Sequence, residues 1–178
     1  TAHAQIGKRF PSEKTIVPDP VTGVPLTFLT STPQGDSKIY PTHPQWTADG
    51  QWLIFRSGRV PGQAMAVNET TGDLVQVTAG GYVGTLCVAQ KSMRLFVMRP
   101  AARPPAAPVD FPPAAGGGER FRGPMEVVVI DLARVFADSR IGRMEPDARY
   151  ERVCGTIPAE LGASPDMALD ATEDTAYF

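Results

Sequence analysis

Short runs of apolar residues separated by turn residues extend along most of this 178-residue chain. Three segments share one arrangement, in which an apolar residue precedes a polar turn and a strand that closes on phenylalanine. They occupy residues 46–55, 87–96 and 169–178, at offsets of 41 and 82 residues. In two further segments, 19–30 and 68–78, a Thr-Gly turn leads into an alternating strand, which is typical of a hairpin. The chain is therefore built from repeated units.

The repeat predicts individual strands. The first complete unit is expected to have strands A to D at 43–47, 51–56, 64–68 and 74–78. The second unit is expected at 84–89, 94–98, 125–132 and 150–154, and the third begins at 166–170. The strand at 24–30 has no A, B or C strand before it. We expect it to complete the last unit of a closed ring, where it would leave no sheet edge exposed.

A period of about 40 to 45 residues with four short strands per unit is typical of a β-propeller blade. The predicted fold class is therefore all-β, a β-propeller with blades at about 31–80, 81–158 and 159–178 in a domain spanning 6–178. Three blades cannot close a ring, so we expect the chain to be the N-terminal portion of a longer protein, with the remainder of the propeller as its partner. One short helical turn is predicted within 133–148.

Residues 100–124 contain seven prolines and four glycines, so they predict a long loop inserted between two strands. Phe111 and Phe121 lie in it, and Arg99, Arg103, Arg120 and Arg122 lie in or beside it. This content predicts a loop that forms one wall of a glycan cleft. The alternative is a solvated tether that contacts nothing.

Charge and composition exclude several classes of protein. Lys+Arg is 17 and Asp+Glu is 19, a net charge of −2, which argues against a protein that coats nucleic acid. No apolar run reaches the roughly 18 residues that a membrane span needs. Cys87 and Cys154 are too few for a disulfide scaffold or a zinc knuckle, and on separate strands they are expected to be free thiols.

The first five residues, Thr-Ala-His-Ala-Gln, have the small-x-small pattern that precedes a signal-peptide cleavage point. Residues 1–5 are therefore interpreted as a signal-peptide remnant, and the protein is expected to be periplasmic or secreted. On this interpretation His3 belongs to the targeting segment and not to a site.

The run from 37 to 57 resembles the blade motif of TolB-type propellers. The matching positions are Pro44, Trp46, Asp49, Gly50, Ile54, Phe55 and Ser57. The start of the chain, its opening Thr-Gly strand and its Tyr-Pro-x-His-Pro run also resemble the seven-bladed polysaccharide lyases, which include oligogalacturonate and ulvan lyases. The resemblance implies about three blades of a seven-bladed ring. Family lyases use histidines of later blades, sometimes with a divalent metal, which residues outside this chain would bind; no metal ligand is assigned here.

In a blade, the D-to-A and B-to-C connections lie on the same face. That places Tyr40 and His43 beside Arg56 and Arg59, and the catalytic candidates are therefore His43 and Tyr40. Lyases that cleave uronates need a cation for the carboxylate, a base for the C5 proton and an acid for the leaving oxygen. The candidate substrate-binding residues are Arg56, Arg59, Arg99 and Arg122, because guanidinium forks suit carboxylates.

Each of these residues also has a structural interpretation. His43 would cap a strand through local backbone bonds, Tyr40 would pack on a neighbouring proline, and the arginines would be solvated loop charges. The repeat positions Trp46, Trp52, Phe55 and Phe96 are expected to be core, and Asp49 and Gly50 to form only a turn.

The leading hypothesis is an exported polysaccharide lyase that acts on a uronate-containing oligo- or polysaccharide by β-elimination. One alternative is a non-catalytic TolB-like propeller that binds a protein or cell-wall partner, since a fold does not fix a function. A second is the gating propeller of a prolyl-oligopeptidase-like peptidase. The chain has no Gly-rich phosphate loop, no CxxC, no HExxH and no Gly-x-Ser-x-Gly motif.

Overall fold

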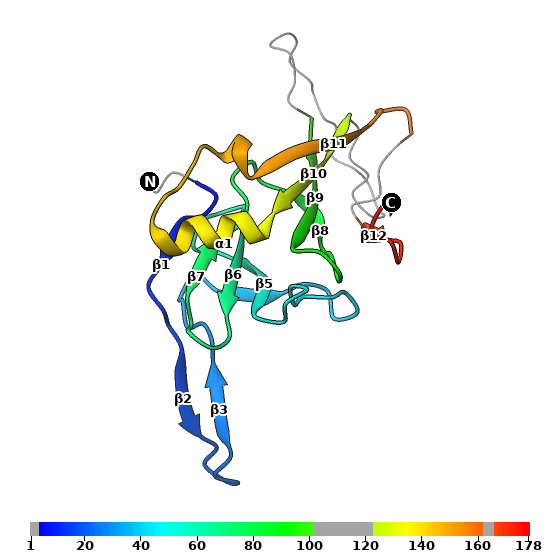
Figure 1. The fold of residues 1–178 in the computed structure, drawn as a ribbon. Helices are drawn as coiled ribbons and strands as arrows, with labels where there is room; N and C mark the ends of the chain where they lie inside the picture. Colours follow the sequence, from blue (N-terminus) through cyan, green and yellow to red (C-terminus); the bar gives the residue numbers. More distant parts are fainter. Residues whose placement is uncertain (1–3, 102–122, 162–165) are drawn as a thin grey trace.

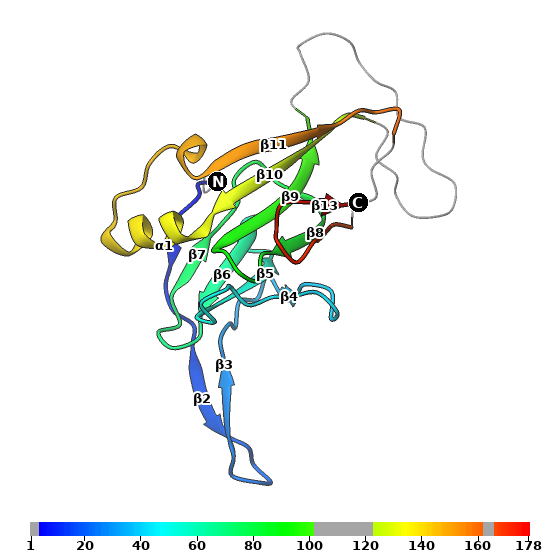
Figure 2. The same cartoon turned by 45° about the vertical axis from the view of Figure 1, so that its right-hand side comes forward.

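The computed structural model describes residues 4–101, 123–161 and 166–178. The described chain is mostly β, with several antiparallel sheets and one α-helix (Figures 1 and 2). The sheets are not closed into a ring. Three predicted features, the signal-peptide motif at His3, most of the 100–124 loop and Arg122, lie outside the described residues.

The first sheet has five antiparallel strands in the order β1-β7-β6-β5-β4. Its strands are β4 (Asp36–Lys38), β5 (Trp52–Ser57), β6 (Ala64–Asn68), β7 (Leu74–Gln76) and β1 (Arg9–Phe10). The chain passes from β4 to β7 between spatial neighbours, as a meander does. The N-terminal β1 then adds to the outer edge, where Arg9 is paired with Val75 and Phe10 with Leu74.

The predicted strand A at 43–47 is wrong in its extent. The strand that pairs with β5 is β4, from Asp36 to Lys38, and within 43–47 only Trp46 forms a bridge, with Leu53. Between them, residues 39–45 form what we call the 39–45 excursion, which leaves the ladder after Lys38 and rejoins it where the carbonyl oxygen of Gln45 accepts from the N–H of Ile54 at 2.8 Å. The physical reason is the pair Pro41 and Pro44, which have no N–H to donate to a neighbouring strand.

The second sheet has the order β11-β10-β9-β8 and is antiparallel throughout. Its strands are β8 (Val83–Val88), β9 (Arg94–Pro100), β10 (Met125–Asp131) and β11 (Glu151–Ile157). All four strands predicted for the second unit are confirmed in the predicted order.

A ten-residue helix, α1 (Leu132–Ile141), follows β10, and the 3-10 helix η1 (Asp147–Arg149) precedes β11. The expectation of one short helical turn is therefore wrong. The Asp131 side chain caps α1 by accepting from the backbone N–H of Arg134 at 3.0 Å, and Gly142 ends it in the left-handed conformation at φ 70°. Its buried residues recur at helical spacing: Leu132, Val135, Phe136 and Ser139.

Two small hairpins complete the described chain. The N-terminal hairpin pairs β2 (Thr15–Pro18) with β3 (Pro25–Phe28). The other pairs β12 (Ala168–Leu169) with β13 (Ala176–Tyr177), and we call it the third hairpin because it contains the third copy of the repeat. The strand predicted at 24–30 to complete the last unit of a ring pairs instead with β2, within its own hairpin. All eight residues of β2 and β3 are exposed, and the hairpin projects away from the sheets (Figure 1).

The repeat is real, but its middle copy is shifted by one residue. The pairs that close the three turns are Trp46 with Leu53, Val88 with Leu95, and Leu169 with Ala176. Each pair encloses six residues. Inside each turn, a backbone N–H donates to the carbonyl oxygen five residues later, from Thr47 to Trp52, from Ala89 to Arg94 and from Asp170 to Thr175. Val88, rather than Cys87, is the structural equivalent of Trp46.

Two clusters of buried side chains join the sheets in chain order. The larger one combines Ile54 and Val75 of the first sheet with Leu95 and Val128 of the second, together with Phe136 of α1. The next combines the other face of the second sheet with Met167, just before the third hairpin, and Leu169, within it. Burial of apolar surface between successive sheets is therefore what holds the described chain together.

The predicted core positions Trp52, Phe55 and Phe96 are buried, whereas Trp46 keeps 40% of its surface exposed. Trp46 is directly opposite Leu53, so the two side chains lie on the same face of the first sheet. The cluster on that face, formed by Phe55, Met65, Val67 and Leu74, does not extend over Trp46. The prediction that Trp46 is core is wrong for this reason.

Candidate functional site

Tyr40 and His43 lie together on the 39–45 excursion. The backbone N–H of His43 donates to the carbonyl oxygen of Tyr40 at 2.9 Å, which closes a tight turn. Their rings meet edge to face, with centroids 5.7 Å apart and an interplanar angle of 77°. The Gln45 side chain accepts from the N–H of Ile39 at 3.2 Å and so joins the two ends of the excursion. The excursion thus presents the phenol and the imidazole as a pair.

The Nδ1 atom of His43 is buried and has no hydrogen-bond partner among the described residues. The side chain lines a cavity of about 530 Å³, here called the His43 cavity, between the excursion and the third hairpin. Other lining residues are Thr42, Pro44, Cys87, Val88, Gln90, Lys91, Met167, Ala168, Leu169, Asp170, Ala171 and Glu173. Tyr40 remains 63% exposed beside it. A nitrogen without a partner can accept or donate a proton, which is the chemistry expected of a candidate base.

The charged groups of the His43 cavity are bound to the protein itself. Lys91 Nζ donates to the carbonyl oxygen of Ala171. The carboxylate of Glu173 accepts from the backbone N–H of Lys91 and from Ser92 Oγ, both at 2.6 Å. These bonds link the second turn of the repeat to the third, and residues of both turns line the cavity.

Cys87 lines the same cavity as a free thiol. Its pKa is raised to about 11, chiefly by burial; a hydrogen bond with the Leu169 backbone lowers the pKa and the charge of Glu173 raises it. Since the thiolate is the nucleophile, a thiol with so high a pKa is unreactive at neutral pH. Cys154 is the other free thiol and is exposed on β11.

Arg59, a candidate for substrate binding, lies in a buried ion-pair cluster. Its side chain is 6% exposed, with Nη2 at 2.5 Å from Glu13 and Nη1 at 2.6 Å from Asp36. The guanidinium also donates to Ser57 Oγ at 2.8 Å and lies 5.9 Å from the centre of the Phe55 ring. Two carboxylates already occupy its fork, so Arg59 fastens the N-terminal segment to β4 and β5.

Arg99 and Arg56 also bind within the protein. Arg99 forms ion pairs with Glu126 at 3.2 Å and with Glu151 at 2.8 Å. Burial alone would lower the pKa of Arg99, but the two carboxylates outweigh burial and the pKa is raised. Arg56 donates through Nη2 to the carbonyl oxygen of Gly84 at 2.9 Å, while its Nε is buried without a partner. None of the described arginines lines the His43 cavity. The structure therefore brings Tyr40 and His43 together, and it does not bring the arginines to them.

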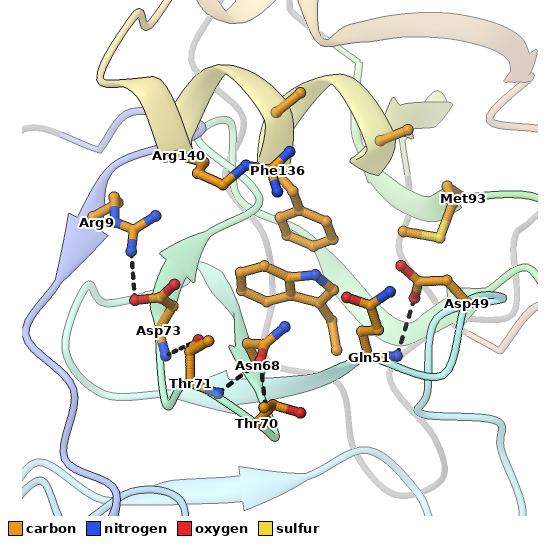
Figure 3. Close-up of a pocket in the computed structure, with 13 residues that line it drawn as sticks. Arg9, Asp49, Gln51, Asn68, Thr70, Thr71, Asp73, Met93, Phe136 and Arg140 are labelled. Carbon is orange, nitrogen blue, oxygen red and sulfur yellow. Dashed lines mark hydrogen bonds and ion pairs between the residues drawn. The ribbon is translucent and has the colours of Figure 1, made fainter.

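A second cavity, of about 510 Å³, lies between α1 and the ends of β5, β6 and β7 (Figure 3). We call it the α1 groove. Its lining residues are Arg9, Asp49, Gln51, Trp52, Asn68, Thr70, Thr71, Asp73, Met93, Ala133, Phe136, Ala137 and Arg140. Trp52 stacks on Phe136 with centroids 4.0 Å apart, and Arg9 forms an ion pair with Asp73. The sequence prediction missed this groove because it did not predict the helix that forms one wall.

Neither a metal site nor a membrane span is found in the described part of the chain. Residues 4–101, 123–161 and 166–178 contain no group of three or more His, Cys, Asp or Glu side chains that could hold a metal ion. Within the same ranges, no helix has the length and apolar character needed to cross a membrane.

Comparison with known proteins finds a likeness among solved structures and none among family models or curated sequences. No protein-family model matches the chain, and no curated protein matches its sequence. Among solved structures, the chain is similar to an oligogalacturonate lyase from Vibrio parahaemolyticus, with 12% sequence identity and a TM-score of 0.38. The match covers 87% of this chain and 49% of the lyase, so this chain spans about half the length of that protein.

Proposed function

We propose that this protein is an exported polysaccharide lyase that cleaves a uronic-acid-containing glycan by β-elimination, and that its successive sheets are blades of a β-propeller. The observation that supports the activity best is the Tyr40–His43 pair, with a buried imidazole nitrogen that has no partner beside a cavity. The order of the strands within each sheet and the packing of one sheet on the next agree with blades.

The elimination needs two proton transfers. A base removes the C5 proton next to the uronate carboxylate, electrons move into a new C4–C5 double bond, and the bond from C4 to the glycosidic oxygen breaks. We assign the base to His43. Tyr40, which is 63% exposed and contacts the His43 ring, is assigned as the acid that protonates the leaving oxygen.

The substrate carboxylate also needs a cation to stabilise the charge that develops when the C5 proton leaves. Arg59 and Arg99 each have their guanidinium neutralised by two carboxylates. Among the described candidate arginines, Arg56 is the one that no carboxylate neutralises; its Nη2 donates to the carbonyl oxygen of Gly84, so we assign the substrate carboxylate to it. Arg122, in the inserted loop, completes the proposed set.

The test is an elimination assay on the full-length protein with polygalacturonate, ulvan and glucuronan. We expect ultraviolet absorbance from the unsaturated uronate to rise with at least one of the three. His43→Ala and Tyr40→Phe should each lower kcat by about 10² to 10⁴-fold. Tyr177→Phe is the matched control, since Tyr177 has the same type of ring and similar exposure, 61% against 63%. Absence of any absorbance change with all three glycans would refute the proposal.

A second candidate is a non-catalytic propeller that binds a protein or cell-wall partner. It is favoured by the ion pairs of Arg59 and Arg99, which leave these arginines no free charge for a substrate. In that case, binding of the partner should be indifferent to His43→Ala and Tyr40→Phe. The same two variants therefore separate the candidates.

A further inference from the structure

The α1 groove has no role in the activity proposed above. Its lining shares no residue with that of the His43 cavity. Its volume of about 510 Å³ is within the range of small-molecule sites. Polar side chains from the strand ends form one wall and α1 forms the other (Figure 3), so a ligand there would touch both.

The wall from the sheet contains a hydrogen-bond donor of fixed orientation. Asn68 is 7% exposed, and its Oδ1 accepts from the backbone N–H groups of Thr70 at 3.0 Å and Thr71 at 2.9 Å. These two bonds decide which end of the amide is the oxygen. The NH₂ end has no partner among the described residues, and it is the part of the side chain left for a ligand.

The same wall contains an acceptor. Asp49 Oδ1 accepts from Thr47 Oγ1 at 2.6 Å and from the backbone N–H of Gln51 at 3.1 Å, which fixes the carboxylate and leaves Oδ2 without a partner in the described chain. A fixed donor and a fixed acceptor on one wall suit hydroxyl groups, because each hydroxyl can both donate and accept. The exposed amide of Gln51 adds both functions between them.

The helix wall contributes an unpaired positive charge. Arg140, in the last turn of α1, makes no hydrogen bond or ion pair with any described residue, whereas Arg9 across the groove is neutralised by Asp73. A free guanidinium binds a carboxylate through charge-assisted, often bidentate hydrogen bonds. The groove therefore combines hydroxyl-binding groups with one carboxylate-binding group.

We propose that the α1 groove binds an acidic sugar, whose carboxylate contacts Arg140 and whose ring hydroxyls contact Asn68 and Asp49. The site is a glycan-binding site apart from the Tyr40–His43 pair. It requires no cleavage, so it stands whether or not the protein is a lyase.

Trp52 is the reporter for the test. The chain has two tryptophans, so Trp46→Phe leaves Trp52, in the groove, as the single source of tryptophan fluorescence. In this background, trigalacturonate should produce a saturable change in emission. Neutral maltotriose and inorganic phosphate, which test the hydroxyl groups and the negative charge separately, should produce none at the same concentration.

Substitutions then locate the contacts. Arg140→Ala should weaken trigalacturonate binding at least about tenfold, as the loss of a charge-assisted hydrogen bond does. Asn68→Asp should also weaken it, because the carboxylate still accepts from Thr70 and Thr71 but offers no donor. Arg143→Ala is the matched control, since Arg143 is exposed just beyond α1 and does not line the groove. Melting temperatures of all variants would show that each is folded.

Three results would overturn the inference. They are no response of Trp52 to trigalacturonate, an equal response to maltotriose or phosphate, and unchanged affinity in Arg140→Ala. Since the readout is binding and not elimination, failure here leaves the absorbance assay for the proposed lyase unaffected, and the reverse also holds.

Discussion

Two of the three turns of the repeat share an unusual backbone conformation through different residues. The fourth residue of the turn has positive φ in two copies, Gly50 at 68° and Glu173 at 64°. Glycine adopts this conformation without strain, whereas for other residues it costs about 1 kcal/mol. Glu173 offsets that cost with its two hydrogen bonds to the second turn. Strain in one turn is thus balanced by a contact with another.

Asp170 makes the third turn sensitive to acid. Its carboxylate accepts from Thr172 Oγ1 at 2.5 Å and from the N–H groups of Asp174 and Thr175 at 3.0 Å each. These bonds, that of Thr172 first, lower the pKa of Asp170 from 3.8 to about 2. Because the pKa is lower in the folded state, the stabilisation is fully present above pH 3.8 and is lost as the pH falls through about 2.

A carboxyl titration by NMR should therefore show an Asp170 midpoint at about 2. Asp170→Asn should make the melting temperature of the protein depend less on pH between about 2 and 3.8. Asp174→Asn is the matched control, an exposed acid in the same turn that should leave the acid dependence in place. A midpoint for Asp170 at its ordinary value would contradict this prediction.

Elements were predictable from the sequence where pairing partners are close along the chain. Apolar alternation located β5 to β7 and β8 to β11 because, within each of the two sheets, these strands pair with their neighbours along the chain. It did not show that β1 joins β7, since nothing in a two-residue strand encodes a partner some 65 residues away. The helix α1 was missed because its length depends on the Asp131 cap and the Gly142 end, which the strand pattern does not include.

In the candidate site, too, the contacts that could be predicted are those between residues close along the chain. Tyr40 and His43 are three residues apart, so a local turn brings them together. The arginines have partners that are remote along the chain, such as Glu13 for Arg59, and no pattern in the sequence predicts those ion pairs. The α1 groove needs both a helix and a sheet, and it could be found only in three dimensions.

The buried cluster around Arg59 should contribute measurably to the stability of the first sheet. Arg59→Ala leaves Glu13 and Asp36 without their cation, and loss of one partner of a buried pair costs about 3 to 5 kcal/mol. Urea unfolding monitored by circular dichroism would measure the change. The control is Arg9→Ala, whose ion pair with Asp73 is more exposed and is worth at most about 1 kcal/mol. Equal effects of the two variants would contradict the prediction.

The whole molecule is a series of sheets packed in chain order, with the N-terminal hairpin outside the packing (Figure 2). Among the described residues, that hairpin carries six of the fourteen exposed large apolar side chains: Ile16, Val17, Val21, Val24, Leu26 and Phe28. An isolated two-stranded hairpin is marginally stable in water. Its apolar surface therefore contributes little to the stability of the sheets.

Replacing residues 16–27 with a short Gly-Ser turn should leave the melting temperature within a few degrees, because no side chain of β2 or β3 is buried. Binding of a hydrophobic dye should fall, since much of the exposed apolar surface is removed. The replacement keeps Glu13, which holds Arg59. Ile141→Ser, at an exposed position on α1, serves as the comparison and should lower dye binding only slightly. A large drop in melting temperature would show that the hairpin supports the sheets.

The 39–45 excursion also limits how these molecules can associate with one another. β4 is the edge of the first sheet, and an open edge is a template on which a strand of another molecule can pair. Here the edge offers three residues, Asp36–Lys38, before the chain turns away through Pro41 and Pro44. An incoming strand would find too few backbone partners to extend the ladder. The segment that presents Tyr40 and His43 thus shortens the stretch of the β4 edge on which another molecule could pair.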